Sequence, residues 1–546
     1  MKTINTRPWL LSLCLVHLAG LVMAAPIQPV AFRVPAKMPD ALEMLSPADV
    51  QLSGMLGERV SRNERNRLAQ VDLEPLLAGF RKKPGIHPWI GEHIGKWLHA
   101  STLAWANTGD AALRAKMDYA VAELAKAQEP DGYLGTYTPD KRFGLYQGAD
   151  WDVWSHKYNL IGLLTYYEFT GNAQALQTAR KVGDLLVGTF GPGKKSILSA
   201  GTHVGMAATS VLEPVVLLYR QTGDERYLEF AKYLVRSWDS PTGPQIIKSL
   251  LEAKSVQKTA NGKAYEMLSN LVGLCELARA TGDRSYLEPV LNAWEDIVAY
   301  RLYLTGSVSQ GEHFHGDYEL PNEMRASVSE TCVTTTWIQL NLQLLRLTGE
   351  ARFGNQLEKT FLNHLSAAQR PDGAQWCYFT SLEGTKPYGP GINCCVSSGP
   401  RGMALAPQAG WLKMSARENE PETLVLDLFD RSTVNTRIGG QAVTIHFESR
   451  FPLQGSATLR VKAAQPVTFG LRIRTPEWAQ PLEVSSPSGK ASGTTLKQDG
   501  STTAFKGKWT VVSARQWKDG DSLALAFSLA PRLVMGEHGN AGKAAL

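Results

Sequence analysis

Thr108-Gly109-Asp110 ends an apolar helical run, and the same pattern returns four more times in the first 350 residues. Each instance has Thr-Gly followed by Asp, Asn or Glu, and successive instances lie about sixty residues apart. Glycine supplies the left-handed position that closes a helix, and the next residue suits the start of another helix through capping or the helix dipole. The other instances are Thr170-Gly171-Asn172, Thr222-Gly223-Asp224, Thr281-Gly282-Asp283 and Thr348-Gly349-Glu350.

A period of two helices plus their connections predicts stacked helical hairpins. Closing five or six hairpins into a ring would bury the inner helices. We therefore predict a mainly α protein whose residues 25–410 form an (α/α)6-toroid, with an open solenoid as the alternative. The long irregular loops at 127–155, 239–262 and 306–328 favour the toroid, because they can build up one face of the ring.

Beyond about residue 410 the apolar pattern changes to alternation with period two, for example over 423–428, 442–447 and 467–473. Short strands at close spacing predict a β-sandwich domain, which we assign to residues 411–546. The sequence stops within 543–546 on what looks like the start of another strand, and this suggests a truncated C-terminus.

The N-terminus has the pattern of a secretory signal over residues 1–24. Lys2 and Arg7 precede an apolar run that ends at Met23, and Val22-Met23-Ala24 matches the small-residue pattern for cleavage. No later apolar stretch is long enough to span a membrane. We therefore expect an exported protein, periplasmic or secreted, with no membrane partner.

Composition narrows the possible partners. The net charge of +6 is spread over 546 residues without basic runs, which argues against a nucleic-acid partner. Fourteen tryptophans and seventeen tyrosines suit flat stacking surfaces such as sugar-binding clefts, although ordinary core packing accounts for most of them. The sequence leaves the oligomeric state unknown.

Two short clusters, Glu330-Thr331-Cys332 and Asn393-Cys394-Cys395, carry three thiols and a carboxylate. Zinc is bound tetrahedrally by these ligand types. Alternate residues of an extended segment point to the same side, so Glu330 and Cys332 can act together, and the Cys-Cys turn can present two more ligands. Adjacent cysteines rarely form a disulfide, because the ring is strained.

The expected export strengthens the interpretation as a zinc site. Removal of the signal segment leaves five cysteines, whereas an oxidising compartment favours an even disulfide framework. Cys275 lies on an apolar helical face and is expected in the core. Cys377 is expected to pack in a strand, with a role in lining the site as the alternative.

The helical toroid, Glu-Thr-Cys, the late Cys-Cys and the β-sandwich together resemble glycoside hydrolase family 127, the β-L-arabinofuranosidases, over most of the mature chain. The resemblance implies an exo-acting glycosidase with an oligosaccharide or glycan substrate. It implies that Cys394 is the nucleophile of a retaining mechanism, and that Glu312, in Gly311-Glu312-His313-Phe314, is the general acid/base. The implied zinc ligands are Glu330, Cys332, Cys394 and Cys395.

This chemistry is self-consistent. Zinc keeps thiols deprotonated near neutral pH, and a thiolate can attack the anomeric carbon. A carboxylic acid protonates the leaving oxygen and then deprotonates the incoming water. Attack by zinc hydroxide is the rival mechanism, but it requires an open coordination position, and four protein ligands leave none.

The resemblance also implies sugar contacts. His156 matches a family histidine that contacts the sugar, and Glu358 and Tyr378 match sugar-binding residues with the family's spacing. The simpler interpretations are a structural histidine, a solvated helix charge and a strand aromatic. The segment Asp131-Gly132-Tyr133-Leu134 resembles a pocket loop of the family, or is a plain turn.

The chain departs from the family where many members have Gly-His-Ala, because it has Gly262-Lys263-Ala264. A second family histidine falls on Ala208, with His203 close but out of register. We predict that Lys263 faces the pocket and helps set specificity, where it could pair with an acidic sugar; a solvated lysine is the alternative.

Two other functional classes stay open at this point. One is a non-catalytic, zinc-stapled glycan-binding protein. The other is a different toroid enzyme, such as a polysaccharide lyase, which would leave the cysteine cluster without a role.

Overall fold

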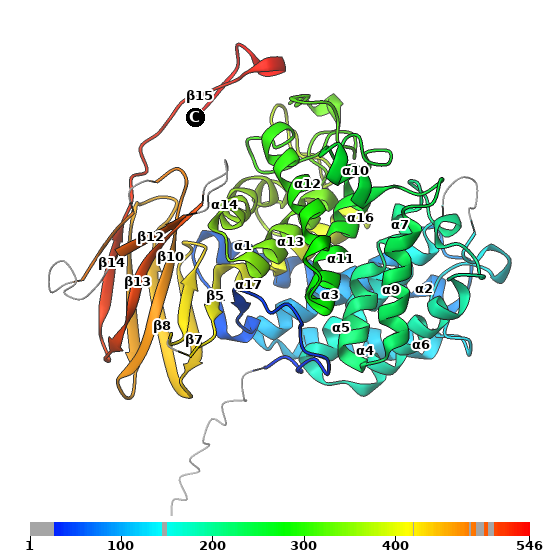
Figure 1. The fold of residues 1–546 in the computed structure, drawn as a ribbon, viewed down its shortest axis with the longest axis horizontal. Coiled ribbons are helices and arrows are strands. Elements are labelled where there is room, and N and C mark those ends of the chain that lie inside the picture. Colours follow the sequence, from blue (N-terminus) through cyan, green and yellow to red (C-terminus); the bar gives the residue numbers. More distant parts are fainter. Residues whose placement is uncertain (1–26, 145–149, 419, 480–481, 487–495, 501–506) are drawn as a thin grey trace, which may run out of the picture.

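The structure is a computed structural model that describes residues 27–144, 150–418, 420–479, 482–486, 496–500 and 507–546. The predicted signal segment 1–24 lies outside these residues. A helical domain is followed by a β-sandwich (Figure 1). None of the described helices has the length and apolar character needed to cross a membrane.

Six helices form the inner ring of the helical domain, and each packs against the next. They are α3 (Glu92–Thr108), α5 (Asp152–Thr170), α8 (Leu212–Thr222), α11 (Ala264–Thr281), α13 (Thr331–Thr348) and α16 (Cys394–Ala404). Helix α16 contacts both α13 and α3, which closes the ring. Helix α11 buries every residue from Ala264 to Ala280, as expected for a helix enclosed on all sides. The predicted toroid is therefore confirmed.

An outer layer of helices packs around this ring, one against each inner helix. The outer helices are α1 (Met55–Asn63), α4 (Ala111–Ala127), α6 (Ala173–Thr189), α9 (Glu225–Ser237), α12 (Leu287–Tyr300) and α14 (Ala351–Lys359). Shorter helices fill the connections: α2 (Glu74–Arg81), α7 (Met206–Thr209), α10 (Ile246–Glu252), α15 (Ser366–Ala368) and α17 (Ala406–Gly410).

The Thr-Gly repeat marks one end of the ring, as predicted. Its five glycines follow α3, α5, α8, α11 and α13, and each has a left-handed φ between 66° and 79°. In four cases the next side chain accepts a hydrogen bond from a backbone N–H of the following helix. The exception is Glu350, which precedes α14 without such a bond.

An extended N-terminal segment, residues 27–42, crosses this same end of the ring. Its backbone N–H groups donate to carbonyl oxygens at the C-terminal ends of four inner helices. These pairs are Val30 with Glu168, Val34 with Arg220, Lys37 with Arg279, and Ala41 with Arg346. The Asp40 carboxylate contacts both Arg279, at 2.8 Å, and Arg346, at 2.6 Å. The segment thus ties the helices together.

The β-sandwich consists of two six-stranded sheets. One has the order β1 (Glu43–Met44), β5 (Trp411–Met414), β6 (Thr423–Leu426), β10 (Val467–Thr475), β13 (Lys508–Trp517), β12 (Leu496–Gly500). The other has the order β11 (Glu483–Ser485), β14 (Ser522–Ala526), β9 (Ser456–Ala463), β8 (Gln441–Ser449), β7 (Ser432–Ile438), β2 (Val50–Leu52).

Strands β1 and β2 precede the helical domain in the sequence, so the N-terminal segment joins both sheets at an edge. We did not predict this contribution from the sequence. Strands of two and three residues are too short to show period-two alternation.

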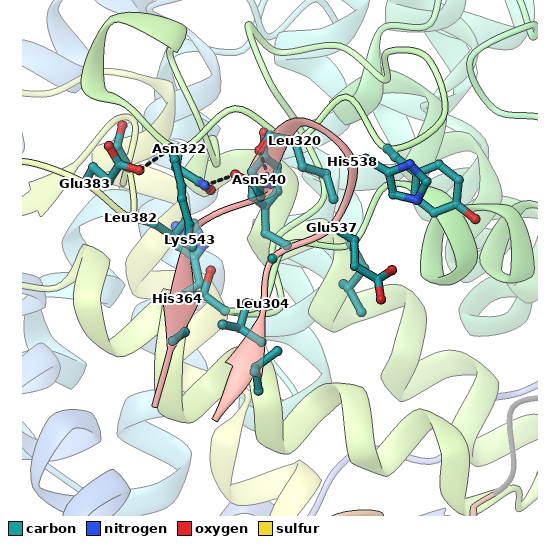
Figure 2. A pocket seen from close by; sticks show the side chains of 18 of the residues that line it. Leu304, Leu320, Asn322, His364, Leu382, Glu383, Glu537, His538, Asn540 and Lys543 are labelled. Atoms are coloured by element: carbon teal, nitrogen blue, oxygen red, sulfur yellow. Dashed lines mark hydrogen bonds and ion pairs between the residues drawn. The ribbon is translucent and has the colours of Figure 1, made fainter. Parts of the chain in front are cut away.

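A C-terminal hairpin, β15 (Val534–Met535) and β16 (Ala544–Ala545), leaves the sandwich and lies against the helical domain (Figure 2). Asn540 donates to the Leu320 carbonyl at 3.0 Å, and the His538 ring stacks on Tyr318 with centroids 3.9 Å apart. A cavity of about 760 Å³ lies between the hairpin and the helices. None of the residues that line it is a predicted site residue.

Candidate active site

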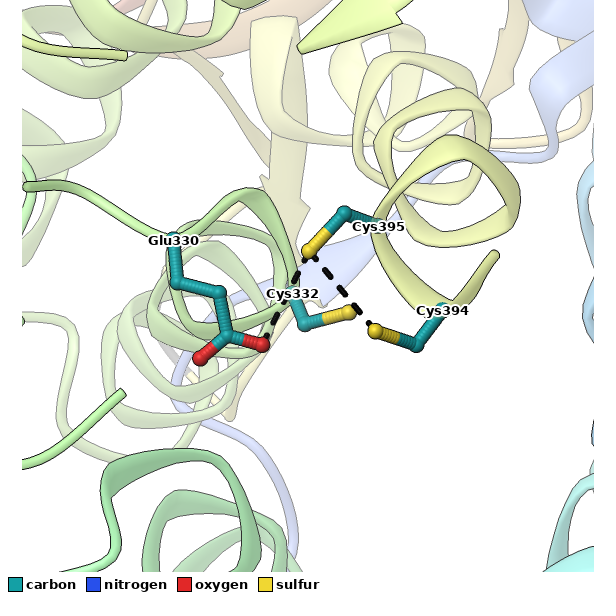
Figure 3. Close-up of side chains that lie close together, drawn as sticks. All are labelled: Glu330, Cys332, Cys394 and Cys395. Atoms are coloured by element: carbon teal, nitrogen blue, oxygen red, sulfur yellow. Dashed lines mark hydrogen bonds between the residues drawn. The ribbon is translucent and has the colours of Figure 1, made fainter. Parts of the chain in front are cut away.

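The four predicted ligands gather at the N-terminal ends of two neighbouring inner helices (Figure 3). Glu330 is the N-cap residue of α13, and Cys332 lies in its first turn. Cys394 and Cys395 begin α16. The donor atoms all lie within 4.8 Å of one another. The positive end of each helix dipole favours anionic groups at this position.

The residue before the cysteine pair orients it. The Asn393 side chain accepts hydrogen bonds from the backbone N–H groups of Cys395, at 3.0 Å, and Val396, at 2.9 Å. This N-cap turns the chain into α16, so that both cysteine side chains lie beside α13 (Figure 3).

The distances within the cluster fit a zinc ion. Cys394 Sγ lies 3.9 Å from Cys395 Sγ, and Cys395 Sγ lies 3.7 Å from Glu330 Oε1. Zinc–sulfur bonds of about 2.3 Å place two tetrahedral sulfur ligands about 3.8 Å apart. The separation is far longer than a disulfide bond of about 2.05 Å. Glu330 Oε2 is buried and has no hydrogen-bonding partner in the described part of the chain.

The acidic groups of the cluster differ in pKa, and one cause is burial. It raises the pKa of Glu330, Cys332 and Cys395 well above their ordinary values. Hydrogen bonds from Cys332 and Cys395 instead hold the pKa of Cys394 well below its ordinary value. Cys394 is also partly exposed, whereas the other three groups are buried. It is therefore the thiol of the cluster best suited to meet a substrate as a thiolate.

Glu312 lies beside the cluster and is linked to Cys394 through Tyr378. The Tyr378 hydroxyl donates to Glu312 Oε1 at 2.6 Å and lies 3.2 Å from Cys394 Sγ. Burial, together with the anionic groups around it, raises the pKa of Tyr378, so the phenol keeps its proton and can donate. One hydroxyl thus separates the predicted nucleophile from the predicted acid/base.

The backbone at Glu312 is left-handed, with φ +67°, a conformation that costs energy for a residue other than glycine. Its carbonyl accepts a hydrogen bond from the backbone N–H of Ala264 at 3.0 Å, which fastens the loop to the start of α11. The strained turn aims the carboxylate into the site.

Lys263 is the N-cap residue of α11, and its ammonium group is bound directly to the Glu312 carboxylate. Burial lowers the pKa of Lys263, but the carboxylates of Glu266, Glu330 and Glu312 raise it above its ordinary value, so the side chain stays charged. The structure therefore places Lys263 at the site rather than in solvent. An acidic sugar would have to compete with Glu312 for it.

His156, which was predicted to contact the sugar, makes hydrogen bonds within the protein through both ring nitrogens. The residue is fully buried in α5, and its Nε2 accepts a hydrogen bond from the Leu134 backbone N–H at 3.2 Å. Its Nδ1 lies 2.8 Å from the Asp152 carbonyl oxygen. The Nε2 contact therefore holds the Leu134 segment against α5, and the Nδ1 contact lies within the first turn of the helix. In that loop Asp131 accepts from the Tyr133 backbone N–H at 3.0 Å, as in a plain turn.

Glu358 was also predicted to contact the sugar, and the structure gives its carboxylate partners within the protein. Its carboxylate lies at the interface between the helical domain and the sandwich, where it pairs with the buried Arg474. The Trp478 indole N–H donates to its other oxygen at 2.9 Å. Both oxygens of the Glu358 carboxylate thus have partners in the β-sandwich domain.

Sequence reasoning missed two buried charged residues beside the site. Lys96, in the second turn of α3, has its ammonium 3.0 Å from Glu92 Oε1, 3.4 Å from the Cys394 carbonyl oxygen and 4.6 Å from the centroid of the Tyr158 ring. Glu266 lies three residues after Lys263 on α11. That spacing puts the two on the same face of a helix, which is the signal that could have found it.

A closed helical toroid with a cluster of thiols and carboxylates at the N-terminal ends of its inner helices is compatible with a carbohydrate-cleaving enzyme, and the comparisons with known proteins decide the class. Residues 59–408 match the family described as beta-L-arabinofuranosidase, GH127 catalytic domain, and residues 423–529 match the GH127 middle domain. The chain belongs to the GH127 family. The predicted resemblance is confirmed, and with it the assignment as an enzyme.

Individual relatives agree with this assignment. The non-reducing end beta-L-arabinofuranosidase of Bifidobacterium longum subsp. longum is 28% identical over 489 residues, which cover 80% of this chain and 70% of the relative. A solved GH127 beta-arabinofuranosidase shares the fold with a TM-score of 0.74 and 21% identity, over 92% of this chain and 82% of its own. A GH127 beta-L-arabinofuranosidase from Geobacillus stearothermophilus T6 also has a TM-score of 0.74 and 21% identity, over 89% of this chain and 83% of its own.

Proposed function

We propose that this glycoside hydrolase is a zinc-dependent, retaining β-L-arabinofuranosidase that acts at the non-reducing end of a glycan. Cys394 is the nucleophile and Glu312 the general acid/base. The observation that carries the proposal is the bridge from Cys394 Sγ through the Tyr378 hydroxyl to Glu312. The names of the GH127 relatives support arabinofuranose as the sugar.

Zinc would be held by Glu330, Cys332, Cys394 and Cys395. Its chemistry when bound is to supply the positive charge that keeps buried thiols and a buried carboxyl in their anionic forms. The Lys96 ammonium, 3.4 Å from the Cys394 carbonyl oxygen, adds a second positive charge beside the cluster.

In the first step the Cys394 thiolate attacks the anomeric carbon while Glu312 gives its proton to the leaving glycosidic oxygen. A carbon–sulfur bond forms and the carbon–oxygen bond breaks. In the second step Glu312 takes a proton from water, the water oxygen bonds to the anomeric carbon, and the sulfur leaves as a thiolate. Glu312 enters the first step protonated and is a carboxylate after it, and Tyr378 and Lys263 position its side chain in both steps.

Stereochemistry tests the mechanism. Hydrolysis of a nitrophenyl β-L-arabinofuranoside, followed by NMR before mutarotation, should release the β-anomer first, because two displacements retain configuration. Cys394→Ser should fold but lose most turnover, since a serine hydroxyl stays protonated. Release of the inverted sugar would exclude Cys394 as the nucleophile.

Elemental analysis tests the metal. Purified protein should contain about one zinc per chain, and Cys395→Ala should lose it. Cys275→Ala is the matched control, because Cys275 is an equally buried thiol in the core of α11 and outside the cluster. A disulfide among the cluster cysteines, with no metal, would contradict the proposal.

We further propose that the enzyme is exported, on the basis of the signal pattern in residues 1–24. N-terminal sequencing of protein recovered from the periplasm or the medium should begin at Ala25. Recovery of the intact N-terminus from the cytoplasm would contradict export.

A further inference from the structure

A second carboxylate, Glu266, faces the site from the first turn of α11. Its exposed fraction is 1%, and burial raises its pKa to about 7. Its Oε1 lies 3.9 Å from His203 Nε2. Its Oε2 is buried and has no hydrogen-bonding partner in the described ranges of the chain. A buried oxygen of this kind costs free energy unless something else, such as a ligand, satisfies it.

Glu266 is close to the reacting groups. It lies one helical turn beyond Lys263, whose ammonium is bound to Glu312. The electrostatic influence of Glu266 reaches both Lys263 and Glu330, and it acts on the pKa of each. The free oxygen is therefore within the site and not elsewhere in the core.

His203 approaches Glu266 from the loop that precedes α7. His203 and Val204 have φ values of +56° and +59°, two successive left-handed residues of a kind that clusters at functional sites. The His203 side chain stays 21% exposed, and its Nδ1 lies 3.3 Å from the Asn261 side-chain nitrogen. Burial, with the positive charge of Lys263, lowers the pKa of His203 to about 4, so the ring is neutral near pH 7.

The charges around Lys263 indicate the class of sugar. Glu312 is bound to it, and Glu266 and Glu330 contribute two further carboxylates nearby. The lysine that could have paired with an acidic sugar is therefore already paired. A uronic acid would therefore have to displace Glu312 from Lys263 to find a cation, whereas a neutral sugar would not.

We propose that Glu266 and His203 select a neutral sugar by its hydroxyl groups, with Glu266 Oε2 accepting a hydrogen bond from one hydroxyl and His203 contacting the same edge of the ring. This inference rests on the proposed function, because it places the sugar between Cys394 and Glu312. It explains how the site can recognise a sugar although Ala208, and not a histidine, occupies the buried α7 position.

The test compares hydroxyl recognition in wild-type and variant enzyme. Glu266→Met keeps a buried side chain of similar length and removes the acceptor. His203→Asn keeps a residue type that tolerates positive φ. The probes are nitrophenyl β-L-arabinofuranoside and its 2-, 3- and 5-deoxy analogues. Glu168→Met is the matched control, because burial also raises the pKa of Glu168 to about 7, while its carbonyl lies at the opposite end of the ring, bound to Val30.

Wild-type enzyme should reject one deoxy analogue by roughly 10- to 100-fold in kcat/KM, which is the effect of losing one hydrogen bond to a carboxylate. Glu266→Met should no longer discriminate between the arabinofuranoside and that deoxy analogue, mostly because its KM for the arabinofuranoside rises. The variant should keep its zinc. His203→Asn should weaken the same preference, and Glu168→Met should leave it unchanged. The proposal would be overturned if Glu266→Met discriminated against the deoxy analogue as strongly as the wild type does. It would also be overturned if the wild type did not discriminate against any of the analogues.

A binding measurement separates this inference from the proposed reaction. Calorimetric titration of zinc-loaded wild-type protein should show tighter binding of L-arabinose than of galacturonate, and Glu266→Met should reduce that difference. If L-arabinose binds but no arabinofuranoside is cleaved, the reaction is refuted, while the comparison with Glu266→Met still decides the role of Glu266. Tighter binding of galacturonate would overturn the inference.

Discussion

The two ends of the inner ring differ in structure: one closes the helices with repeated caps, and the other carries the candidate active site. At the C-terminal ends of the helices, five Thr-Gly caps repeat one local solution, and the segment 27–42 bonds to the exposed carbonyls. At the N-terminal ends lie free thiols, buried charges and strained turns. Left-handed residues other than glycine occur there at His203, Val204 and Glu312.

The contrast suggests that one end of the ring matters mainly for the free energy of unfolding and the other for catalysis. At the cap end, backbone N–H groups of the segment 27–42 donate to the helix carbonyls, and this stabilises the ring. The site end keeps groups that the chain does not satisfy, such as Glu330 Oε2 and Glu266 Oε2, and these suit a metal and a sugar. We therefore expect substitutions at the two ends to have separable effects, on stability at one and on catalysis at the other.

The largest expected effect is at the site end. Glu312→Gln removes the proton donor, so hydrolysis of a natural arabinoside should fall by roughly 10²- to 10⁴-fold. Nitrophenyl substrates should lose much less rate, because their leaving groups need little protonation. Zinc content and the unfolding midpoint should stay at wild-type values. Full activity of the variant on a natural arabinoside would refute the role of Glu312 as acid.

The next effect belongs to the cap end. Asp40→Ala leaves Arg279 and Arg346 without their shared carboxylate, and Arg279 is almost fully buried. Removing one partner of a buried ion pair costs up to about 3–5 kcal/mol. Arg279 keeps a second carboxylate, Glu276, at 2.7 Å, so the loss should lie at the lower end of that range. Urea unfolding should show this loss, while kcat/KM of the folded enzyme stays within about twofold of wild type. Lys37→Ala, an exposed change in the same segment, is the control. A large fall in kcat/KM would mean that the two ends are coupled.

A pH-dependent effect of intermediate size is expected beside the site. Burial raises the pKa of Asp150 to about 8, and its Oδ1 accepts from the Asp152 backbone N–H at 2.8 Å. The folded-state pKa exceeds the unfolded value, so Asp150 contributes stability at low pH and loses it as pH rises from about 4 to 8.

Asp150→Asn should remove this pH dependence and keep the hydrogen-bond acceptor. Relative to wild type, the variant should gain roughly 3 kcal/mol of unfolding free energy between pH 5 and pH 8. More than two of the roughly four units between the unfolded and folded pKa values fall in this range, at ~1.4 kcal/mol per unit. Urea unfolding at pH 5, 6.5 and 8 measures the difference. Parallel curves for the two proteins at all three values would show that Asp150 is not the titrating group.

The same contrast explains what the sequence could predict. The caps depend on adjacent residues, so Thr-Gly-Asp alone indicated the helix ends and the toroid. The metal cluster was found by its unusual residue types. Glu358 was misplaced because its partner Arg474 lies 116 residues further along the chain, in another domain. Sequence spacing carries no information about such a contact.

Glu266 and Lys96 were missed for a related reason. Each is a buried charge on an inner helix, and its importance comes from neighbours in other segments: His203 for Glu266, and the Cys394 carbonyl for Lys96. For His156 the family resemblance predicted a sugar contact. In the structure both of its ring nitrogens have partners within the protein.

The smallest effect measures one cap alone. Gly109 ends α3 with φ +73°, and a Cβ added there would meet no atom within 4 Å. Gly109→Ala therefore tests only the left-handed backbone, which should cost about 1 kcal/mol. Gly132, in the loop at the site end, also has positive φ, but its added Cβ would lie 2.3 Å from the Lys181 carbonyl oxygen. Gly132→Ala should therefore lose clearly more stability than Gly109→Ala in urea unfolding. Equal losses would show that backbone conformation alone sets the cost at both ends, and that the site-end loop is free to move away from Lys181.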